Sequence, residues 1–342
     1  MRMTRANDFE RFALGNFPLQ SGAILRDATL AYATFGTLDA KRRNVIVIPS
    51  AYGGTHADSM WLIGPDKPFD PERYFIVATN MFGNGLSTSP TTAADGQRGP
   101  AFPNVTVYDN VEAQHRLVVE HFGVQSIALV AGFSMGAQQA FHWGARAPER
   151  VQRIAPFCGS ARTAEHNIVF LDGIAATLRA DTAFAAGHYT QPPRVGLEAM
   201  ARVWAGWGLS QTFYREEAWR KMGFASREAF IDDAYVASFG AGDANNFLAM
   251  LWTWRHADVG AHARYAGDTQ AALAAITARA LVMPARTDLY FPPEDNAREV
   301  AAMPNAELAI IPTINGHASG GGMDPADNAW IASHLRELLA RT

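Results

Sequence analysis

A serine flanked by glycines follows a run of small apolar residues in SIALVAGFSMGAQQA (residues 126–140), and this stretch constrains the fold more than any other. The apolar run predicts a buried strand, and the residues after the serine have a helical pattern. G-x-S-x-G at such a junction predicts a sharp turn that holds Ser134 in strained backbone geometry. Gly132 and Gly136 suit this turn because side chains there would collide with it. The N-terminus of the following helix would face any negative charge formed at the serine.

Other apolar runs end in turn residues and predict further strands. Their hydrophobicity is nearly continuous rather than alternating, which is typical of strands covered on both faces. Helical periodicity fills the gaps, and this order predicts an α/β fold with a mostly parallel sheet and right-handed crossovers. The expected strands are Asn44–Ser50, Tyr74–Asn80, Ser126–Gly132, Arg153–Gly159, Ala278–Ala285 and Ala306–Pro312. The expected helices are Val107–Phe122, Met135–Ala147, Pro293–Met303 and Asp327–Leu339.

A long middle stretch interrupts this alternation, because it contains no convincing strand. We predict that it is a helical lid over the sheet, so that the chain divides into a first core part at residues 1–163, the lid at 164–267 and a second core part at 268–342. Helical patterns are clearest in Leu197–Trp207, Phe213–Met222 and Asn246–His256. Packing within the lid accounts for most of its tryptophans, and one or two are expected to line a substrate tunnel: Trp204, Trp207, Trp219, Trp252 and Trp254.

Ser134 can act as a nucleophile only if a base takes its proton and a carboxylate orients that base. In folds with this turn, the acid follows a late strand and the histidine follows the last one. Asp288 follows the run Ala278–Ala285, and His317 lies in a glycine-rich loop after the run Ala306–Pro312. We therefore predict a catalytic triad of Ser134, His317 and Asp288.

Rival residues fit simpler roles. Glu294 and Asp295 lie at the start of a predicted helix, where carboxylates interact favourably with the helix dipole. His56 also lies in a loop near the same edge of the sheet, and it ranks below His317. Cys158 follows an apolar run, so a buried and inert thiol is expected.

Acyl transfer also requires N–H donors for a developing oxyanion. We predict the backbone amide of Met135, directly after the nucleophile, as one donor. The loop PSAYGG follows an early strand, and we predict the amide of Tyr52 as the other donor, because Gly53 and Gly54 let the backbone approach closely. The chain contains no zinc, Walker or dinucleotide-binding motif, so no metal and no cofactor are expected.

Composition narrows the class of protein further. Of 342 residues, 48% are hydrophobic and 18% are charged, which predicts a substantial core. The net charge is −4 and no basic run occurs, so nucleic acid is not an expected partner. The chain has one cysteine, no apolar segment long enough to span a membrane, and an N-terminal stretch, MRMTRANDFERF, without a signal-peptide core. A cytoplasmic enzyme that acts on a small ester or acyl donor, without a membrane partner, is the expectation.

Several motifs together resemble the homoserine O-acetyltransferase family of α/β-hydrolase fold enzymes. They are LIGPDKPFDPERYFIVATN, FPNVTVYDNVEAQ, GFSMGAQQAFHWGARAPERV and TDLYFPPED, with DTAFAAGHY and GLEAMAR in the predicted lid. The resemblance covers most of the chain and implies the α/β-hydrolase fold, the same roles for Ser134, Asp288 and His317, and a lid that forms a tunnel and often a dimer interface. It also implies that Arg202 reaches down the tunnel to the substrate. The resemblance therefore also implies that this chain can form a homodimer through the lid.

The chain departs from the family pattern at sites that matter for the acyl acceptor. It reads GFSMGA where the family has GGSMGG, and LSTSP (Leu86–Pro90) where the family has GSTGP. Ala318 replaces the aspartate that follows the catalytic histidine and helps to hold the amino group of homoserine. Without that carboxylate a buried ammonium group is poorly compensated. We therefore expect water as the acceptor, which makes the protein a carboxylic-ester hydrolase for small acyl groups.

Two other functions fit the same fold. An acetyl-CoA-dependent O-acetyltransferase would use every catalytic residue named above, so the triad does not separate it from an esterase. A non-catalytic ligand receptor would not require all three of Ser134, His317 and Asp288, and their joint presence argues against it.

Overall fold

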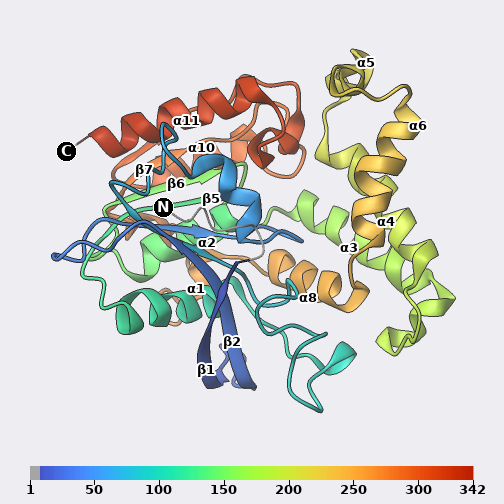
Figure 1. Ribbon diagram of the computed structural model, residues 1–342, viewed down its shortest axis with the longest axis horizontal. Helices are drawn as coiled ribbons and strands as arrows, with labels where there is room; N and C mark the ends of the chain where they lie inside the picture. The colour runs from blue at the N-terminus through green and yellow to red at the C-terminus, as the bar shows by residue number, and fades with distance from the viewer. Residues whose placement is uncertain (1–7, 342) are drawn as a thin grey trace.

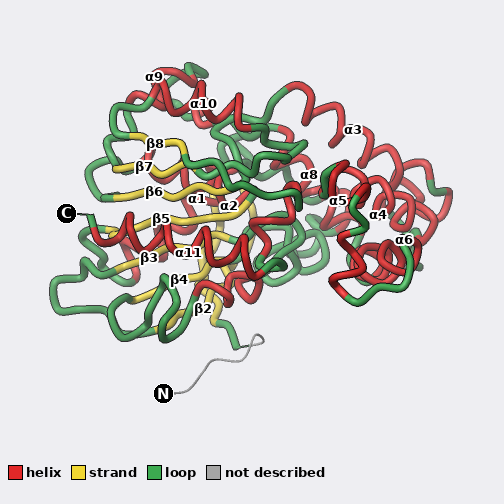
Figure 2. Tube along the Cα trace, turned by 90° about the horizontal axis from the view of Figure 1, so that it is seen from above, coloured by secondary structure: helices red, strands yellow, loops and turns green. Residues whose placement is uncertain are grey.

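Eight strands form one sheet in the computed structural model, which describes residues 8–341. The strands are β1 (Glu10–Pro18), β2 (Ile24–Phe35), β3 (Val45–Pro49), β4 (Phe75–Thr79), β5 (Ile127–Phe133), β6 (Arg153–Phe157), β7 (Arg279–Val282) and β8 (Ala306–Leu308). Their order across the sheet is β1-β2-β4-β3-β5-β6-β7-β8, and Figure 2 shows this order from β2 to β8. Strands β3 to β8 pair in parallel, so the predicted α/β fold with a mostly parallel sheet is confirmed. The first seven residues of the N-terminal stretch MRMTRANDFERF lie outside the described residues.

Both faces of the parallel strands are buried, which accounts for their continuous hydrophobicity. Neighbouring residues of a strand point to opposite faces. Val45 and Val47 pack in one cluster with helices α1 (Val107–His115) and α2 (Met135–Arg146). Ile46 and Ile48 pack in a second cluster with α11 (Pro325–Ala340) on the other face (Figure 1). An uninterrupted run of Val and Ile therefore fills two layers of core at once.

The first two strands form an antiparallel pair that lacks the continuous apolar runs of the other strands. β1 pairs with β2, and β2 pairs with β4, both antiparallel. Most of β1 is exposed or half-buried, and its register shifts on both sides of Gly15, which has a φ of +63°. An edge strand with one wet face and a bulge carries only a weak, irregular alternation of polar and apolar residues. Figure 1 shows this pair projecting from one end of the sheet.

Helices and short helical turns connect the strands in the predicted order. The predicted helix over Val107–Phe122 is α1 followed by a wider turn, η3 (Arg116–His121). The remaining elements of this part are η1 (His56–Leu62), η2 (Gly99–Ala101), α9 (Thr269–Ala274), α10 (Pro293–Ala302) and η8 (Gly316–Gly321).

Between β6 and β7 the chain is helical, and the described residues there contribute no strand to the sheet. We refer to residues 165–255 as the helical segment. The predicted single helix over Phe213–Met222 is divided at Glu217, which has a φ of +49°. The segment and its continuation comprise α3 (Glu165–Ala180), η4 (Thr182–Gly187), α4 (Arg194–Gly208), α5 (Gln211–Arg215), η5 (Ala218–Met222), α6 (Arg227–Phe230), η6 (Ile231–Val236), α7 (Ala237–Gly240), α8 (Ala244–Arg255) and η7 (Val259–Ala261).

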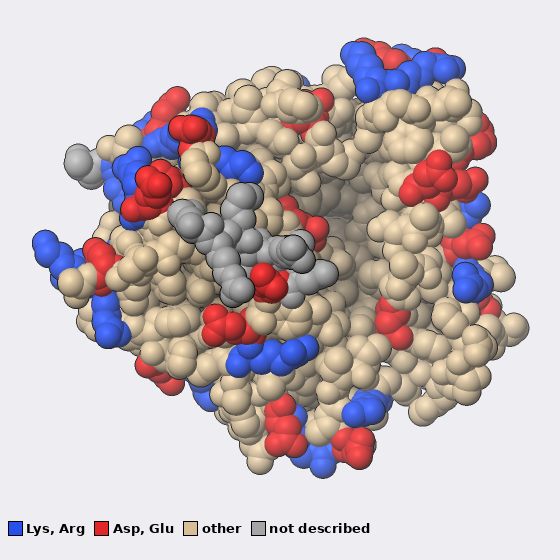
Figure 3. Space-filling model, viewed as in Figure 1, with Lys and Arg blue, Asp and Glu red and all other residues tan. Residues whose placement is uncertain are grey.

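An aromatic cluster joins the helical segment to the rest of the molecule. Trp204 and Trp254 of the segment pack in one cluster with Met135, Tyr290 and Phe291, which belong to the sheet part of the chain. Figure 3 shows a hollow between the segment and the remainder of the molecule, lined mainly by uncharged side chains. The segment therefore stands over the end of the sheet at which Ser134 lies. The exact boundaries 164 and 267 for a separate lid stay a prediction.

None of the helices in the described part of the chain combines the length and the apolar character needed to cross a membrane.

Candidate active site

Ser134 occupies the turn between β5 and α2 with a φ of 55° and a ψ of −122°. Non-glycine residues rarely adopt a positive φ, so surrounding contacts must hold this conformation. A Cβ atom at Gly132 would lie 2.2 Å from the carbonyl oxygen of Gly136, and one at Gly136 would lie 2.5 Å from that of Pro49. The two glycines are therefore required by close backbone contacts, and the strand–turn–helix geometry is the one that the motif predicts.

Replacing Gly136 by alanine is expected to lower the free energy of unfolding by about 1–3 kcal/mol, because the new methyl group must displace the backbone of Pro49. Urea unfolding measures this loss. Gly206→Ala is the matched control, since a Cβ atom at this helical position would have no neighbour within 4 Å. Alanine there should raise stability by about 0.5–1 kcal/mol. Equal effects of the two substitutions would contradict a requirement for glycine at position 136.

Three side chains that are distant in the sequence meet at the carboxyl edge of the sheet. The Ser134 Oγ lies 2.9 Å from Nε2 of His317, and Nδ1 of His317 lies 2.8 Å from Oδ2 of Asp288. All three residues are buried, with exposed fractions of 3%, 8% and 4% in the order Ser134, His317, Asp288. With Nδ1 protonated, His317 donates to the carboxylate and can accept the hydroxyl proton at Nε2. The structure thus brings together all three residues predicted as the triad.

The loop after β7 holds the Asp288 carboxylate in a fixed orientation. Its Oδ1 accepts hydrogen bonds from the backbone amides of Tyr290 and Phe291, at 2.8 and 3.1 Å. Its Oδ2 is left to His317. Two amide donors stabilise the ionised carboxylate in a buried place where it would otherwise be costly.

The sequence analysis missed a threonine that links the loop carrying Asp288 to the loop carrying His317. The Thr287 hydroxyl accepts a hydrogen bond from the amide of Gly316 at 3.1 Å and donates one to the carbonyl of Thr313 at 3.1 Å. Thr287 immediately precedes Asp288, and Gly316 immediately precedes His317. One hydroxyl group therefore fixes the separation of the two loops. Its position next to the predicted acid was the only sequence signal.

Aromatic rings restrain the imidazole of His317 on two sides. The Phe133 ring lies with its centroid 4.7 Å from that of the imidazole, at an interplanar angle of 30°. Tyr290 presents its ring at 4.9 Å and 79°. Aromatic contact of this kind limits the rotation of the imidazole and interacts favourably with its protonated form.

Two backbone amides near Ser134 are available to an incoming ligand. Met135 is the first residue of α2, and Tyr52 lies in the turn after β3. Neither amide donates a hydrogen bond to any residue that the structure describes. The Tyr52 ring stacks on Trp204 of the helical segment, with ring centroids 4.8 Å apart, and burial raises the pKa of the Tyr52 hydroxyl. The roles predicted for these amides as oxyanion donors belong to the proposal below.

Comparison with known proteins gives the family. The family described as "alpha/beta hydrolase fold" matches residues 44–196. A probable esterase of Corynebacterium glutamicum is 40% identical over 337 residues, which cover 97% of this chain and 95% of that protein. The chain belongs to the α/β-hydrolase family. An ethyl acetate hydrolase of Pseudomonas veronii is 38% identical to this α/β-hydrolase, over 97% of this chain and 95% of that protein.

A solved structure supports the same assignment. The crystal structure of an acetylester hydrolase from Corynebacterium glutamicum superposes on this α/β-hydrolase with a TM-score of 0.95 and 38% identity, covering 98% of this chain and 97% of that one. A homoserine O-acetyltransferase of Chlorobaculum parvum is 32% identical, over 88% of this chain and 87% of that protein. The predicted kinship is therefore confirmed at the level of the α/β-hydrolases. Membership of the homoserine O-acetyltransferases is not confirmed, because the esterases match with higher identity over more of the chain.

Arg202, which the resemblance implies as a substrate contact, pairs with two carboxylates of the helical segment. Arg202 lies on an exposed face of α4, where its guanidinium pairs with Glu198 at 3.4 Å and with Asp232 at 3.1 Å. Its side chain is 49% exposed. Two exposed carboxylates thus hold its guanidinium, and Arg202 shares no hydrogen bond with Ser134. That Arg202 reaches the substrate stays a prediction.

The rival residues of this α/β-hydrolase have other contacts. His56 is buried, its backbone amide bonds to the Asn80 side chain, and its Nδ1 lies 3.1 Å from Nδ2 of Asn80. Asp295 lies in the first turn of α10, as predicted. Cys158 is fully buried, and burial raises the pKa of its thiol, so an inert thiol is consistent with its surroundings. None of these residues shares a hydrogen bond with Ser134.

A buried carboxyl group outside the triad supports the floor of the site. A Cβ atom at Gly159 would lie 2.6 Å from the carbonyl oxygen of Ser134, so this part of the chain packs directly under the turn. Glu299 accepts a hydrogen bond from the amide of Ala161 at 2.7 Å and another from Asn296 at 2.7 Å. Asn296 also donates to the carbonyl of Gly159 at 2.8 Å. Glu299 and Asn296 together hold the chain at Gly159 and Ala161 in place under the turn. Nothing in the local sequence pattern indicates this role of Glu299 and Asn296.

Stability should depend on pH through Glu299. Burial raises the pKa of this carboxyl group to about 8. The folded state keeps the proton at pH values where the unfolded chain has released it, so the free energy of unfolding should fall between about pH 5 and pH 8. The expected fall is on the order of a few kcal/mol. Urea unfolding of wild type and Glu299→Gln across this range measures it, because the variant has no proton to lose. A stability difference between the two proteins that stays constant with pH would contradict the assignment.

Among the described residues, no group of three or more His, Cys, Asp or Glu side chains is placed to hold a metal ion.

Proposed function

We propose that this α/β-hydrolase hydrolyses carboxylic esters of small acyl groups through an acyl-enzyme on Ser134. The observation that carries the proposal is the buried hydrogen-bonded row from Ser134 through His317 to Asp288. A hydroxyl, a base and an orienting carboxylate in this geometry are the components of nucleophilic acyl transfer.

In the proposed reaction, the Ser134 hydroxyl attacks the ester carbonyl while Nε2 of His317 takes its proton. The amides of Met135 and Tyr52 donate to the oxyanion of the tetrahedral intermediate, at the N-terminus of α2. His317 then gives the proton to the departing alcohol, and an acyl-enzyme remains. Water, deprotonated by His317, attacks the acyl-enzyme, and His317 returns the proton to the Ser134 oxygen as the acid leaves. Asp288 keeps the imidazole in the required tautomer throughout.

Two observations support a small acyl group. Relatives that match almost the whole chain carry the names ethyl acetate hydrolase and acetylester hydrolase. The loop that carries Tyr52 is also covered by large rings, because Tyr52 stacks on Trp204 and lies 5.9 Å from the ring of Trp254. Bulky rings next to the oxyanion loop favour a short acyl chain.

Water is favoured over homoserine as the acceptor. Residue 318 is alanine, so the position after His317 offers no carboxylate to an ammonium group. A substrate ammonium brought into a buried site without a partner would lose its hydration uncompensated. An acetyl-CoA-dependent O-acetyltransferase, which would use the same triad, is the second candidate because of its 32% identical relative.

A chain-length series and an acceptor test together examine the proposal. The expected kcat/KM for p-nitrophenyl acetate exceeds that for the octanoate by at least about tenfold. Acetyl-CoA with homoserine should give no O-acetylhomoserine above the blank. Efficient homoserine acetylation would favour the second candidate, and a preference for octanoate would overturn the small-acyl assignment.

A cytoplasmic location stays a prediction.

We also expect the protein to form a homodimer through the helical segment. Three valines on α3 and α4 are unusually exposed: Val169 at 68%, Val195 at 74% and Val203 at 39%. Exposed apolar side chains favour association. Light scattering should give about twice the chain mass of 37.1 kDa, and Val195→Lys should shift it towards the monomer. A monomeric wild type would contradict the expectation.

A further inference from the structure

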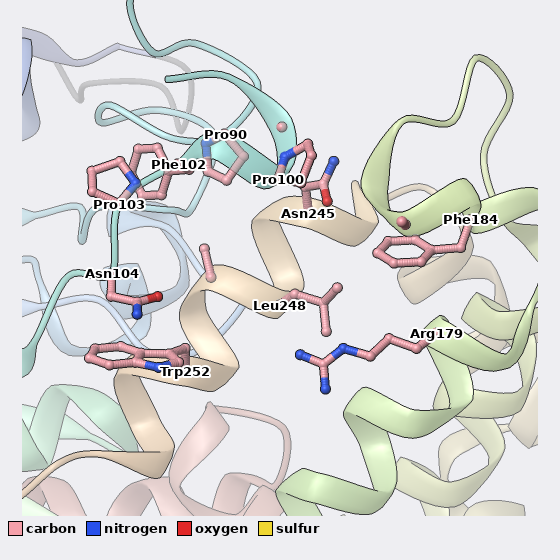
Figure 4. A pocket seen from close by; sticks show the side chains of 13 residues that line it. Pro90, Pro100, Phe102, Pro103, Asn104, Arg179, Phe184, Asn245, Leu248 and Trp252 are labelled. Atoms are coloured by element: carbon pink, nitrogen blue, oxygen red, sulfur yellow. The ribbon is translucent and has the colours of Figure 1, made fainter. Parts of the chain in front are cut away.

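Apart from the hollow above Ser134, a cavity lies between the helical segment and the loop that precedes α1. Its volume is about 560 Å³. The helical segment contributes Arg179 at the end of α3, Phe184 in η4 and Trp252 in α8, whereas the loop contributes Phe102 and Asn104. Figure 4 shows these side chains around a common space. A cavity of this size can hold a small organic molecule.

The cavity is separate from the candidate active site, because α8 stands between them. One face of α8 carries Met250 and Trp254, which pack in the cluster that contains Met135. The other face carries Trp252, which lines the cavity, whereas the lining residues Leu248 and Phe184 also pack in or against that cluster. A ligand in the cavity would therefore contact α8 on the side of Trp252, and Leu248 and Phe184 would connect it to the aromatic cluster beside Ser134.

Arg179 brings a positive charge to the wall of the cavity, and after Arg255 it helps to lower the pKa of Asp172 on the same helix. Among the described residues it forms neither an ion pair nor a hydrogen bond, and Figure 4 shows its guanidinium directed towards α8. Asp172 on the same helix is already occupied, since Arg255 donates to its two carboxylate oxygens at 2.8 and 3.3 Å. A guanidinium at the wall of a cavity, without a hydrogen-bonded carboxylate among the described residues, suits a planar anion that accepts two parallel hydrogen bonds.

The rest of the wall combines aromatic, proline and aliphatic side chains with two asparagines, Asn104 and Asn245. The Trp252 ring is held in place by stacking on His256, with ring centroids 4.0 Å apart and an interplanar angle of 23°. Phe102 and Phe184 add two further rings. The Asn104 side-chain amide, above Trp252 in Figure 4, forms no hydrogen bond with a described residue. Such a wall favours a ring with one charged end over a compact, fully hydrated anion.

Backbone strain in η4 accompanies this wall. Ala185 and Ala186 have φ values of 49° and 53°, and Ala186 lines the cavity next to Phe184. Consecutive non-glycine residues with positive φ are costly, and such strain tends to persist where a site must be shaped.

We propose that this cavity binds a small aromatic carboxylate. The carboxylate would lie against Arg179, and the ring would extend towards Trp252, beside which Figure 4 shows the Asn104 amide. One guanidinium suits a singly charged carboxylate, whereas inorganic phosphate would bring a larger charge and no ring to use the apolar wall. The bound acid would contact both the helical segment and the loop before α1, so its binding should raise the melting temperature of the folded protein.

Isothermal titration of the full chain with benzoate tests the proposal. Benzoate should bind with a dissociation constant of about 1 mM or tighter, whereas benzamide and inorganic phosphate should bind at least about tenfold more weakly. Arg179→Gln should weaken benzoate binding at least about tenfold, and Asn104→Ala and Trp252→Leu should each weaken it a few-fold. Arg194→Gln is the matched control, because Arg194 is another exposed arginine of the helical segment without an ion pair among the described residues.

The outcomes separate the cavity from the active site. Benzoate binding that depends on Arg179 and Trp252, and that persists after covalent blocking of Ser134, supports the proposal. Failure to bind, equal binding of benzoate and phosphate, or binding that none of the three cavity variants weakens would overturn it. Thermal unfolding of each variant shows that it is folded, so a loss of binding reports on the cavity.

Discussion

Ser134→Ala is expected to reduce kcat for p-nitrophenyl acetate by about 10⁴–10⁶. The substitution removes the only oxygen that lies within hydrogen-bond distance of Nε2 of His317 among the described residues, at 2.9 Å. It leaves the backbone amides near the turn in place, so a small residual rate above that of water alone should remain. Initial rates at saturating substrate, with a detection limit at the level of the uncatalysed reaction, measure the loss.

Ser238→Ala is the matched control for this experiment. Ser238 is an exposed serine of α7 in the helical segment, and its substitution should leave kcat unchanged. Thermal unfolding should show that both variants fold. A Ser134→Ala enzyme that keeps more than about a tenth of wild-type kcat would contradict the nucleophile assignment.

Asp288→Asn is expected to lower kcat by about 10⁴ while leaving the fold intact. The carboxylate accepts the amides of Tyr290 and Phe291 at one oxygen, so an asparagine would keep its carbonyl oxygen there. Its NH₂ group would then face Nδ1 of His317, which must become the acceptor. The proton moves to Nε2, and the imidazole can no longer take the proton of Ser134. The pH–rate profile and kcat for p-nitrophenyl acetate measure the effect.

Asp295→Asn serves as the comparison, because Asp295 is the rival carboxylate in the first turn of α10. This variant should keep near-wild-type activity and lose only a fraction of a kcal/mol of stability through the helix dipole. Strong inactivation by Asp295→Asn together with an active Asp288→Asn enzyme would reverse the assignment.

The parallel half of the sheet could be predicted because each of its strands is buried on both faces. Val45–Pro49 is buried at every position, and a short uninterrupted apolar run that ends in turn residues is typical of such a strand. β1 and β2 escaped prediction for the opposite reason. Their exposed face admits polar residues, and the bulge near Gly15 disturbs the alternation that would otherwise mark an antiparallel strand.

The three central site residues could be predicted because chain order and strand ends determine where they meet. Ser134, Asp288 and His317 each follow a strand that ends at the same edge of the sheet. Arg202 could not be placed this way, since its direction depends on the rotation of α4 about its own axis and on the partners Glu198 and Asp232. A motif match carries over the residue type but not the direction of the side chain.

The supporting residues depend on contacts that no local pattern reveals. Thr287 bonds to Gly316, 29 positions later, and Glu299 bonds to Ala161 at a separation of 138 positions. Such contacts arise only when the loops are already folded together. Buried polar groups of this kind are satisfied by partners from elsewhere in the fold, so the structure is needed to find them.

The most direct test of the central claim is covalent labelling with diethyl p-nitrophenyl phosphate, followed by mass spectrometry of the digested protein. If Ser134 is the activated nucleophile, one phosphoryl group should be found on the peptide that contains it, loss of esterase activity should match the extent of labelling, and Ser134→Ala should stay unlabelled. Complete inactivation with the label on a different residue, or retained activity after Ser134 is fully labelled, would contradict the account.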